Sequence, residues 1–356
     1  LLLTSFPLFI KGAPNSTQTL NEAFDKTLVL SEDFKRSHMY VSETGLTERK
    51  FTLRNMLPNH SLSGSISIAV DGKSIYAGRI SVEGGNEWTH DFAVEEREGK
   101  LQSALVEAEF LTDGLDASEK FSTNSESLGA IEVSHTLTID GDLSDWPAES
   151  KIEMEPRHKT FAPWGENSAE MRRKYPQGVS WQGDSDLSCV LYMAWDSKNL
   201  YIGYDVTDDV LHPHPKLASA WQGDSIQIYF DGWADAKSQF KTGFDVNDQV
   251  FDVWYNEGKA ILRRAVAPER QLAFLDVGIV DSASTAFSRT EGGYIVEMAI
   301  PRQDIAPVKL QKGSIFGFAT MINENDKGYR HLGLTLTPAG TEPFLRPHLY
   351  PSVILK

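Results

Sequence analysis

The fold is decided by residues 196–231, which read DSKNLYIGYDVTDDVLHPHPKLASAWQGDSIQIYFD. Apolar and polar residues alternate from Leu200 to Val206 and again from Ile226 to Phe230. This period of two predicts two β-strands, each with one buried face. The loop between them carries Trp221 and several polar groups that neither strand needs for its own stability.

Length and charge set the limits on what this segment belongs to. The chain has 356 residues, enough for two domains with separate cores, and a formal net charge of −16. Such a surface repels phosphate backbones and anionic lipid, so nucleic acid and membrane surfaces are poor partners. Cys189 is the only cysteine, which excludes an internal disulfide framework. The apolar run Leu1–Ile10 is too short to span a bilayer and is predicted to be a first β-strand.

Residues 1–127 are predicted to form a first domain, an immunoglobulin-like or fibronectin-like β-sandwich. Short alternating segments with turn residues between them are typical of such all-β folds. The expected strands are Phe51–Leu53, Gly64–Val70, Ser74–Val82, Trp88–Val94 and Ala104–Leu111. Asp71-Gly72 is predicted to join two of them in a tight hairpin. We find no catalytic constellation in this part of the sequence.

A polar, serine-rich stretch, Asp116–Gly129, follows and is predicted to be a linker. The second domain is then expected over residues 128–356. Its sequence contains five motifs in order, which are Ile139-Asp140-Gly141, Asn199-Leu200-Tyr201-Ile202, Trp221 to Asp231, Gly292 to Glu297 and Gly317-Phe318. In this order they resemble the family 9 carbohydrate-binding modules. The resemblance covers about residues 131–356.

The resemblance implies a non-catalytic β-sandwich that holds a sugar between two aromatic side chains, with calcium bound nearby. The first stacking position falls on Trp221, and the second falls on Phe344, with Tyr350 as the alternative. Flat aromatic rings suit the C–H faces of a pyranose, while its hydroxyl groups need polar partners at the rim. We therefore expect a carbohydrate ligand.

Polar residues around the expected ligand differ from the family pattern. Gln227 stands where the family has a glutamate, and Asp252 stands where an arginine is expected. Met321 replaces a glutamine, so the sequence does not name the sugar. The long insertion at residues 151–186 adds Trp164 and Trp181, which are expected either to border the site or to attach the loop to the sandwich.

A calcium site is expected in the loop that carries Trp221, because calcium prefers carboxylate and carbonyl oxygens on irregular loops. The predicted ligands are Asp208, Asp209 and Asp224. A second acidic group, at residues 140–145, lacks the spacing of an EF-hand. His212 and His214 offer nitrogen ligands for a transition metal, although histidines in a surface loop usually face solvent.

Two other function classes stay open from the sequence. Asp205 and Asp252 form a carboxylate pair that a glycosidase would need at a defined separation. Met193, Met298 and Met321 are available as haem ligands, although methionines on alternating strands are usually part of a core. The preferred hypothesis is an exported, non-catalytic module of a glycan-degrading protein, located outside the cell, in the periplasm or on the cell surface. A catalytic domain in the same precursor is then the expected partner.

Overall fold

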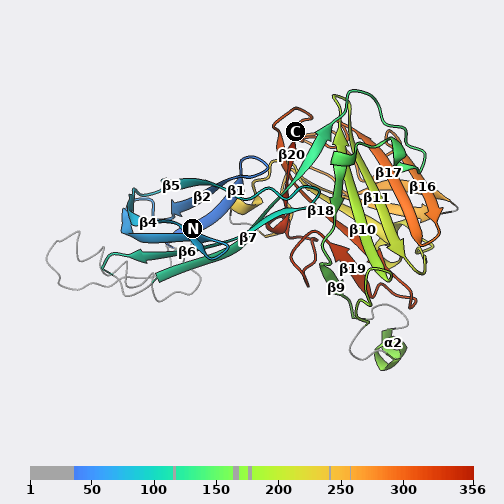
Figure 1. The fold of residues 1–356 in the computed structure, drawn as a ribbon, viewed down its shortest axis with the longest axis horizontal. Coiled ribbons are helices and arrows are strands. Elements are labelled where there is room, and N and C mark those ends of the chain that lie inside the picture. Colours follow the sequence, from blue (N-terminus) through green and yellow to red (C-terminus); the bar gives the residue numbers. More distant parts are fainter. Residues whose placement is uncertain (1–35, 115–117, 163–167, 175–178, 240–241, 257) are drawn as a thin grey trace.

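The computed structural model describes residues 36–114, 118–162, 168–174, 179–239, 242–256 and 258–356. Two β-rich units lie next to each other, and strand β7 (Ser118–Glu132) runs from one into the other (Figure 1). The predicted strand Leu1–Ile10 and the predicted site residue Trp164 lie outside the described residues. The arrangement confirms the predicted all-β fold class.

The first unit packs two sheets against each other. One sheet has the order β1–β2–β5, and the other has the order β4–β3–β6–β7. The strands are β1 (Ser37–Glu43), β2 (Glu48–Asn55), β3 (Leu62–Val70), β4 (Lys73–Val82), β5 (Glu87–Ala93) and β6 (Gln102–Thr112). Asp71 and Gly72 both have positive φ, as the tight turn between β3 and β4 requires. The five predicted strands of this unit are all present.

The second unit is a larger sandwich of two sheets. In one sheet the order is β16–β17–β11–β10–β8. In the other it is β15–β14–β13–β12–β18, and both β19 and β20 pair with the far edge of β18. The strands are β8 (Lys151–Glu153), β9 (His158–Thr160), β10 (Leu187–Trp195), β11 (Asn199–Asp208), β12 (Ser225–Asp231), β13 (Asp248–Asn256), β14 (Lys259–Val266), β15 (Gly278–Ile279), β16 (Ser284–Thr290), β17 (Gly293–Pro301), β18 (Ile315–Glu324), β19 (Leu332–Thr335) and β20 (Ser352–Leu355).

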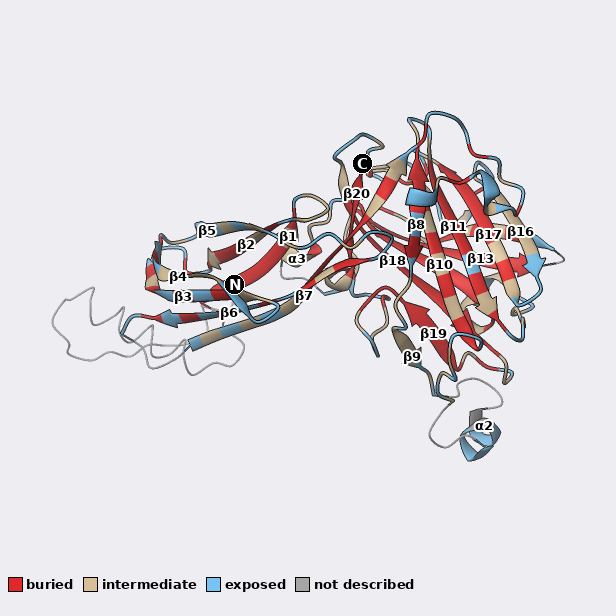
Figure 2. Cartoon of the chain, in the orientation of Figure 1, coloured by how far each residue is buried: buried red, intermediate tan, exposed pale blue. Residues whose placement is uncertain are grey.

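The alternation in residues 196–231 places the two predicted strands in opposite sheets. Leu200, Ile202 and Tyr204 on β11 and Ile226 and Ile228 on β12 are all buried in one core between the sheets. Figure 2 shows buried residues concentrated on the strands of this unit. Burial of apolar surface of this extent is the main stabilising term of the sandwich.

The predicted linker at residues 116–129 is wrong, because residues 118–132 form strand β7. Its first part pairs with β6, whereas Ser127 to Ala130 pairs in parallel with β20. Side chains in the first part are exposed or half-buried, and Ser125 and Ser127 are buried where the two units meet. These buried hydroxyl groups are satisfied, since Ser125 donates to Glu43 and Ser127 to the Leu46 carbonyl.

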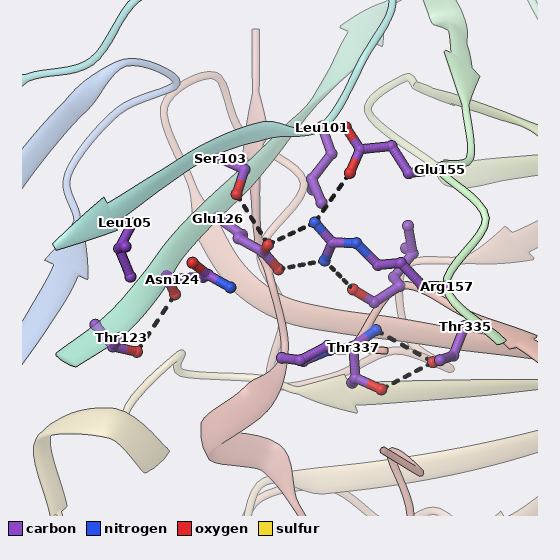
Figure 3. A network of polar contacts seen from close by, with 12 residues as sticks. Leu101, Ser103, Leu105, Thr123, Asn124, Glu126, Glu155, Arg157, Thr335 and Thr337 are labelled. Carbon is purple, nitrogen blue, oxygen red and sulfur yellow. Dashed lines mark hydrogen bonds and ion pairs between the residues drawn. The ribbon is translucent and has the colours of Figure 1, made fainter. Parts of the chain in front are cut away.

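Buried ion pairs connect the two units. Glu43 on β1 accepts hydrogen bonds from Lys237 and from Ser352 on β20, both at 2.8 Å. Figure 3 shows a second contact, in which Arg157 bonds both Glu126 on β7 and Glu155. Because Glu126 is nearly inaccessible to solvent, its charge depends on this arginine.

Helical segments are short throughout the described residues. They are η1 (Leu143–Asp145), η2 (Ala148–Ser150), α2 (Ser168–Lys174), η3 (Leu217–Gln222), α3 (Ala236–Gln239) and η4 (Pro347–Leu349). Within the described part of the chain, no helix has the length and apolarity that crossing a membrane requires. Segment η3 carries Trp221, the predicted stacking residue, and ends shortly before β12.

Candidate functional site

The outer face of the β14–β13–β12–β18 sheet collects the polar residues of the predicted site. On β12, Ile226 and Ile228 point into the core, so Gln227 between them points to the outer face. The register places Gln227 opposite Asp252 on β13 and opposite Met321 on β18. The three positions at which the sequence departs from the family pattern are therefore direct neighbours in the fold.

A chain of side-chain hydrogen bonds crosses this face, and we call it the polar row. Arg263 lies 2.8 Å from Asp252, and Gln227 donates to the other oxygen of Asp252 at 3.1 Å. Asn323 donates to Gln227 at 3.4 Å, and Arg330 donates to Asn323 at 3.1 Å. Each member of the polar row therefore has a partner on the neighbouring strand or loop.

Arg330 ends the polar row between two aromatic rings. Its guanidinium carbon lies 3.6 Å from the ring centre of Phe161 and 4.9 Å from that of Trp221. Glu342 accepts a hydrogen bond from the same guanidinium at 3.4 Å. Stacking of a guanidinium on aromatic faces is favourable, so Arg330 fixes the surroundings of Trp221.

Exposure separates the floor of this face from its rim. Gln227, Asp252 and Asn323 are buried, so the two polar residues predicted to contact a ligand lie beneath their neighbours. Burial raises the pKa of Asp252, and the hydrogen bond from Gln227 and the charge of Arg263 oppose that rise. Side chains that keep some exposure are those of Trp221, Arg263, Arg330 and Glu342. A ligand on this face would meet the rim first.

The two predicted C-terminal aromatics lie at different depths. Phe344 is 47% exposed and packs edge-on against Phe244, with 5.3 Å between ring centres. Tyr350 is only 1% exposed, packs at a tilted angle against Tyr229 and donates a hydrogen bond from its hydroxyl group to the Pro343 carbonyl. Phe344 keeps a surface for ligand contact, whereas Tyr350 belongs to the support beneath the face.

Trp181 does not line this face. Its ring stacks on His158 at 4.4 Å, and its indole nitrogen donates to the Leu187 carbonyl at 2.9 Å. The side chain also packs against the core between the two sheets. Trp181 therefore attaches the insertion to the sandwich, which was one of the two roles expected from the sequence.

Four carboxylates meet beside the polar row, where the ends of several strands converge. Asp186 precedes β10, Asp209 follows β11, and Glu324 and Asp326 lie at the end of β18. One ligand oxygen from each lies within 4.8 Å of those of the other three. We call these four residues the carboxylate cluster.

The carboxylate cluster is short of positive charge. Glu324 is fully buried, and neither of its carboxylate oxygens has a hydrogen-bond partner among the described residues; the same holds for one oxygen of Asp326. Burial, followed by the charges of Asp186 and Asp326, raises the pKa of Glu324 to about 9. Burial and the charge of Asp209 likewise raise the pKa of Asp326. Oxygens left in this state fit a hard divalent cation such as calcium.

His331 does not supply the missing charge. Its Nε2 lies 3.8 Å from Glu324 and 3.9 Å from Asp326. Burial and the nearby Lys327 lower the pKa of His331 to about 4, so the imidazole is neutral at physiological pH. Two groups of close metal-binding side chains occur among the described residues, the carboxylate cluster and a set formed by Glu324, Asp326 and His331. His212 and His214 belong to neither of them.

Of the three predicted metal ligands, only Asp209 joins the carboxylate cluster. Asp208 is buried and accepts the Val210 amide at 2.9 Å, and burial raises its pKa to about 6. Asp224 accepts the backbone amides of His212 and Asn325. These two residues therefore hold the loop together. Glu324 and Asp326 were missed, although an acidic pair directly after an alternating strand is a usable signal.

The alternative functions find little support in this geometry. Asp205 points outward from β11 in one sheet, and Asp252 points outward from β13 in the other. A carboxylate pair with the whole core between its members cannot flank one glycosidic bond. Met193 and Met298 are fully buried in that core, and Met321 is buried beneath Arg330.

Comparison with known protein families identifies the second unit. The family model described as carbohydrate family 9 binding domain-like matches residues 161–356. The chain belongs to this family. The match covers both sheets of the second unit, the polar row and the carboxylate cluster, and the family is one of binding domains rather than catalytic ones.

Relatives of known name match only this part of the chain. Endo-1,4-beta-xylanase A of Thermotoga neapolitana is 31% identical over 138 residues, which is 38% of this chain and 11% of the relative. Exoglucanase XynX of Acetivibrio thermocellus is 27% identical over 152 residues, which is 43% of this chain and 12% of the relative. The chain thus spans about a tenth of the length of these relatives.

Solved structures of family 9 modules are also similar. The family 9 module from Caldicellulosiruptor kristjanssonii in complex with cellotriose is 18% identical with a TM-score of 0.46, covering 65% of this chain and 93% of that one. The structure of such a module with glucose is 20% identical with a TM-score of 0.45, covering 65% of this chain and 95% of that one.

Proposed function

We propose that the second unit binds carbohydrate on the outer face of the β14–β13–β12–β18 sheet, with Trp221 as the stacking platform. The observation that carries this proposal is the position of Trp221 beside the polar row. An aromatic ring offers apolar surface to the C–H face of a sugar, and neighbouring charged groups bond its hydroxyls. Phe344, exposed near the same face, is the second candidate platform.

Charges on this face favour a neutral sugar. Arg263 is paired with Asp252, and Arg330 is paired with Glu342, so each cation already has an anion beside it. An anionic ligand would have to displace one of these carboxylates. Neutral hydroxyl groups can instead share the remaining hydrogen-bonding capacity of both partners.

We further propose that the chain is an accessory part of a secreted protein that degrades plant-type polysaccharide. Support comes from the named relatives, a xylanase and an exoglucanase, whose similarity to this chain is limited to about a tenth of their length. A catalytic domain in the same precursor would then be the partner, and the module would hold it on its substrate outside the cell. Binding in this way raises the local concentration of substrate without new catalytic groups.

Calcium is the proposed cofactor, bound by the carboxylate cluster in a structural role. The four members of the cluster supply oxygen ligands, and the buried oxygens of Glu324 have no hydrogen-bond partner among the described residues. Calcium takes six to eight oxygen ligands, so backbone carbonyls or water would complete the set. When bound, the ion neutralises the four carboxylates and holds together the loops that bear them.

The test is binding of a panel of soluble and insoluble glycans to the wild type and to Trp221→Ala, measured by calorimetry and affinity gels. We expect the substitution to weaken binding at least about tenfold, which corresponds to 1.4 kcal/mol, with an unchanged melting temperature. Trp233→Ala is the matched control, because Trp233 is also partly exposed but follows the opposite end of β12. Absence of glycan binding by the wild type, or equal binding by Trp221→Ala, would refute the proposal.

A further inference from the structure

Two loops contribute residues both to the carboxylate cluster and to the rim of the outer face of the β14–β13–β12–β18 sheet. The segment between β11 and β12 contributes Asp209 to the cluster and Trp221 to the rim. The segment between β18 and β19 contributes Asp326 to the cluster and Arg330 to the rim. A change in the spacing of the cluster therefore moves the segments that carry both rim residues.

Direct hydrogen bonds join the two loops between the cluster and the rim. The backbone amide of Asn325 donates to Asp224 at 2.6 Å, and its side-chain amide donates to the Gln222 carbonyl at 3.2 Å. Gln222 follows Trp221 directly, and Asn325 lies between Glu324 and Asp326. The path from a cluster carboxylate to the stacking ring is thus one hydrogen-bonded step.

We propose that cation binding at the carboxylate cluster sets the positions of Trp221 and Arg330, so that cation binding and glycan binding are coupled. The inference rests on the proposed glycan and calcium sites and adds their linkage. Without the ion, the ionised carboxylates of the cluster repel each other at close range and favour wider separation of the two loops. With the ion, the loops are drawn together and Trp221 is held beside Arg330.

Coupling between two sites is reciprocal, which makes the inference measurable from either side. Glycan affinity of the wild type should be at least about fivefold higher in saturating calcium than in chelator. Calcium affinity should rise by the same factor when glycan is saturating. Asp326→Asn should reduce both the calcium affinity and the calcium-dependent gain in glycan affinity. Asp142→Asn, which alters an exposed carboxylate in a distant turn, should change neither.

A readout without glycan separates this inference from the proposed function. The protein would be labelled with 5-fluorotryptophan, and the ¹⁹F signal of Trp221 would be identified by its loss in Trp221→Phe. Calcium should shift or sharpen this signal in the wild type and leave that of Trp88, in the first unit, unchanged. Magnesium and zinc serve as comparison ions.

The possible results point to different conclusions. If calcium binds but leaves the Trp221 signal and the glycan affinity unchanged, the coupling is refuted while both sites stand. If calcium neither raises the melting temperature nor shifts or sharpens any ¹⁹F signal, the cation site itself is refuted, and the coupling with it. If calcium moves the Trp221 signal but no glycan binds in any condition, the coupling of cation to ring is supported and the proposed glycan function fails.

Discussion

The polar row and the carboxylate cluster are two sets of polar groups, each with buried members, but they differ in how their charges are compensated. In the polar row, Asp252 has both Arg263 and Gln227, and Asn323 has both Gln227 and Arg330. In the carboxylate cluster, both oxygens of Glu324 lack a hydrogen-bond partner among the described residues. A buried polar network is stable alone only when its members are satisfied.

The comparison shows which of the two sets depends on something outside the chain. The polar row forms from strands whose register brings donors opposite acceptors, so the protein alone supplies every partner. The carboxylate cluster brings together like charges, which folding would disfavour unless a cation or protons compensate them. We therefore expect the polar row to keep its structure without a ligand, and the carboxylate cluster to depend on a cation or on protonation.

Removal of calcium should produce the largest effect. At a calcium concentration of about 100 times Kd, binding to the folded state stabilises it by about 2.7 kcal/mol. For a domain of this size, that corresponds to a rise in melting temperature of roughly 5–10 °C over the chelated protein. Differential scanning calorimetry with and without chelator measures this shift. Equal melting temperatures would show that the carboxylate cluster, like the polar row, is stable without a bound cation.

Glu324→Gln should change the melting temperature in calcium but not in chelator. In chelator, the substitution replaces a buried carboxyl group that is protonated at neutral pH by a neutral amide, so the variant should melt at about the wild-type temperature. In saturating calcium, it removes an ion ligand, so most of the calcium-induced rise should disappear. Asp142→Asn is the control and should follow the wild type in both conditions. A variant that melts below the wild type in chelator would contradict the claim that the Glu324 carboxyl group has no stabilising partner in the absence of an ion.

Arg330→Met should break the end of the polar row. The carbonyl oxygen of Asn323 would lose its donor, and Glu342 its cation, at a cost of roughly 1–3 kcal/mol in unfolding free energy. A destabilisation should be present both with and without calcium, because the polar-row partners of Arg330 are supplied by the chain itself. Chemical denaturation measures the loss, and Arg346→Met, at an exposed position, is the matched control. No loss of stability would mean that the polar row is not a structural network.

Asp248→Asn should have the smallest effect, and it tests a buried carboxylate outside both sets. One oxygen of Asp248 lacks a hydrogen-bond partner among the described residues, and burial raises its pKa to about 8. Because the folded form keeps a proton that the unfolded form has lost, stability should fall as pH rises from about 4 to about 8. The variant should lose less stability than the wild type between pH 5 and pH 6, by about 1 kcal/mol.

Thermal melts across this pH range, in chelator, measure the difference. Parallel curves for the wild type and Asp248→Asn would show that this carboxyl group titrates normally. Of the regions compared, the carboxylate cluster would then be where burial is expected to raise the pKa of carboxyl groups.

Much of the architecture was predictable because strand formation leaves a local signature. The alternation at Leu200–Val206 and Ile226–Phe230 marked the two strands that now lie in opposite sheets, and Asp71-Gly72 marked a hairpin. The order of the motifs indicated the family that the comparison shows. Trp221 was predicted as a stacking residue from its place in the family motif, and the structure places it in η3, shortly before β12.

Tertiary structure alone decided the features that depend on pairing between distant segments. Strand β7 looked like a linker because its serines are polar, and only its neighbours β6 and β20 make it a strand that joins two units. Arg330 reaches Trp221 from a different loop, more than a hundred residues along the chain. The carboxylate cluster draws its members from Asp186 to Asp326.

The sequence by itself therefore determined most of the strands and the family, because period-two burial and motif order are readable along the chain. Which charges are neutralised and which are left uncompensated was decided by the fold. Electrostatic compensation depends on distance in space and on burial, and neither is encoded in the spacing of residues along a sequence.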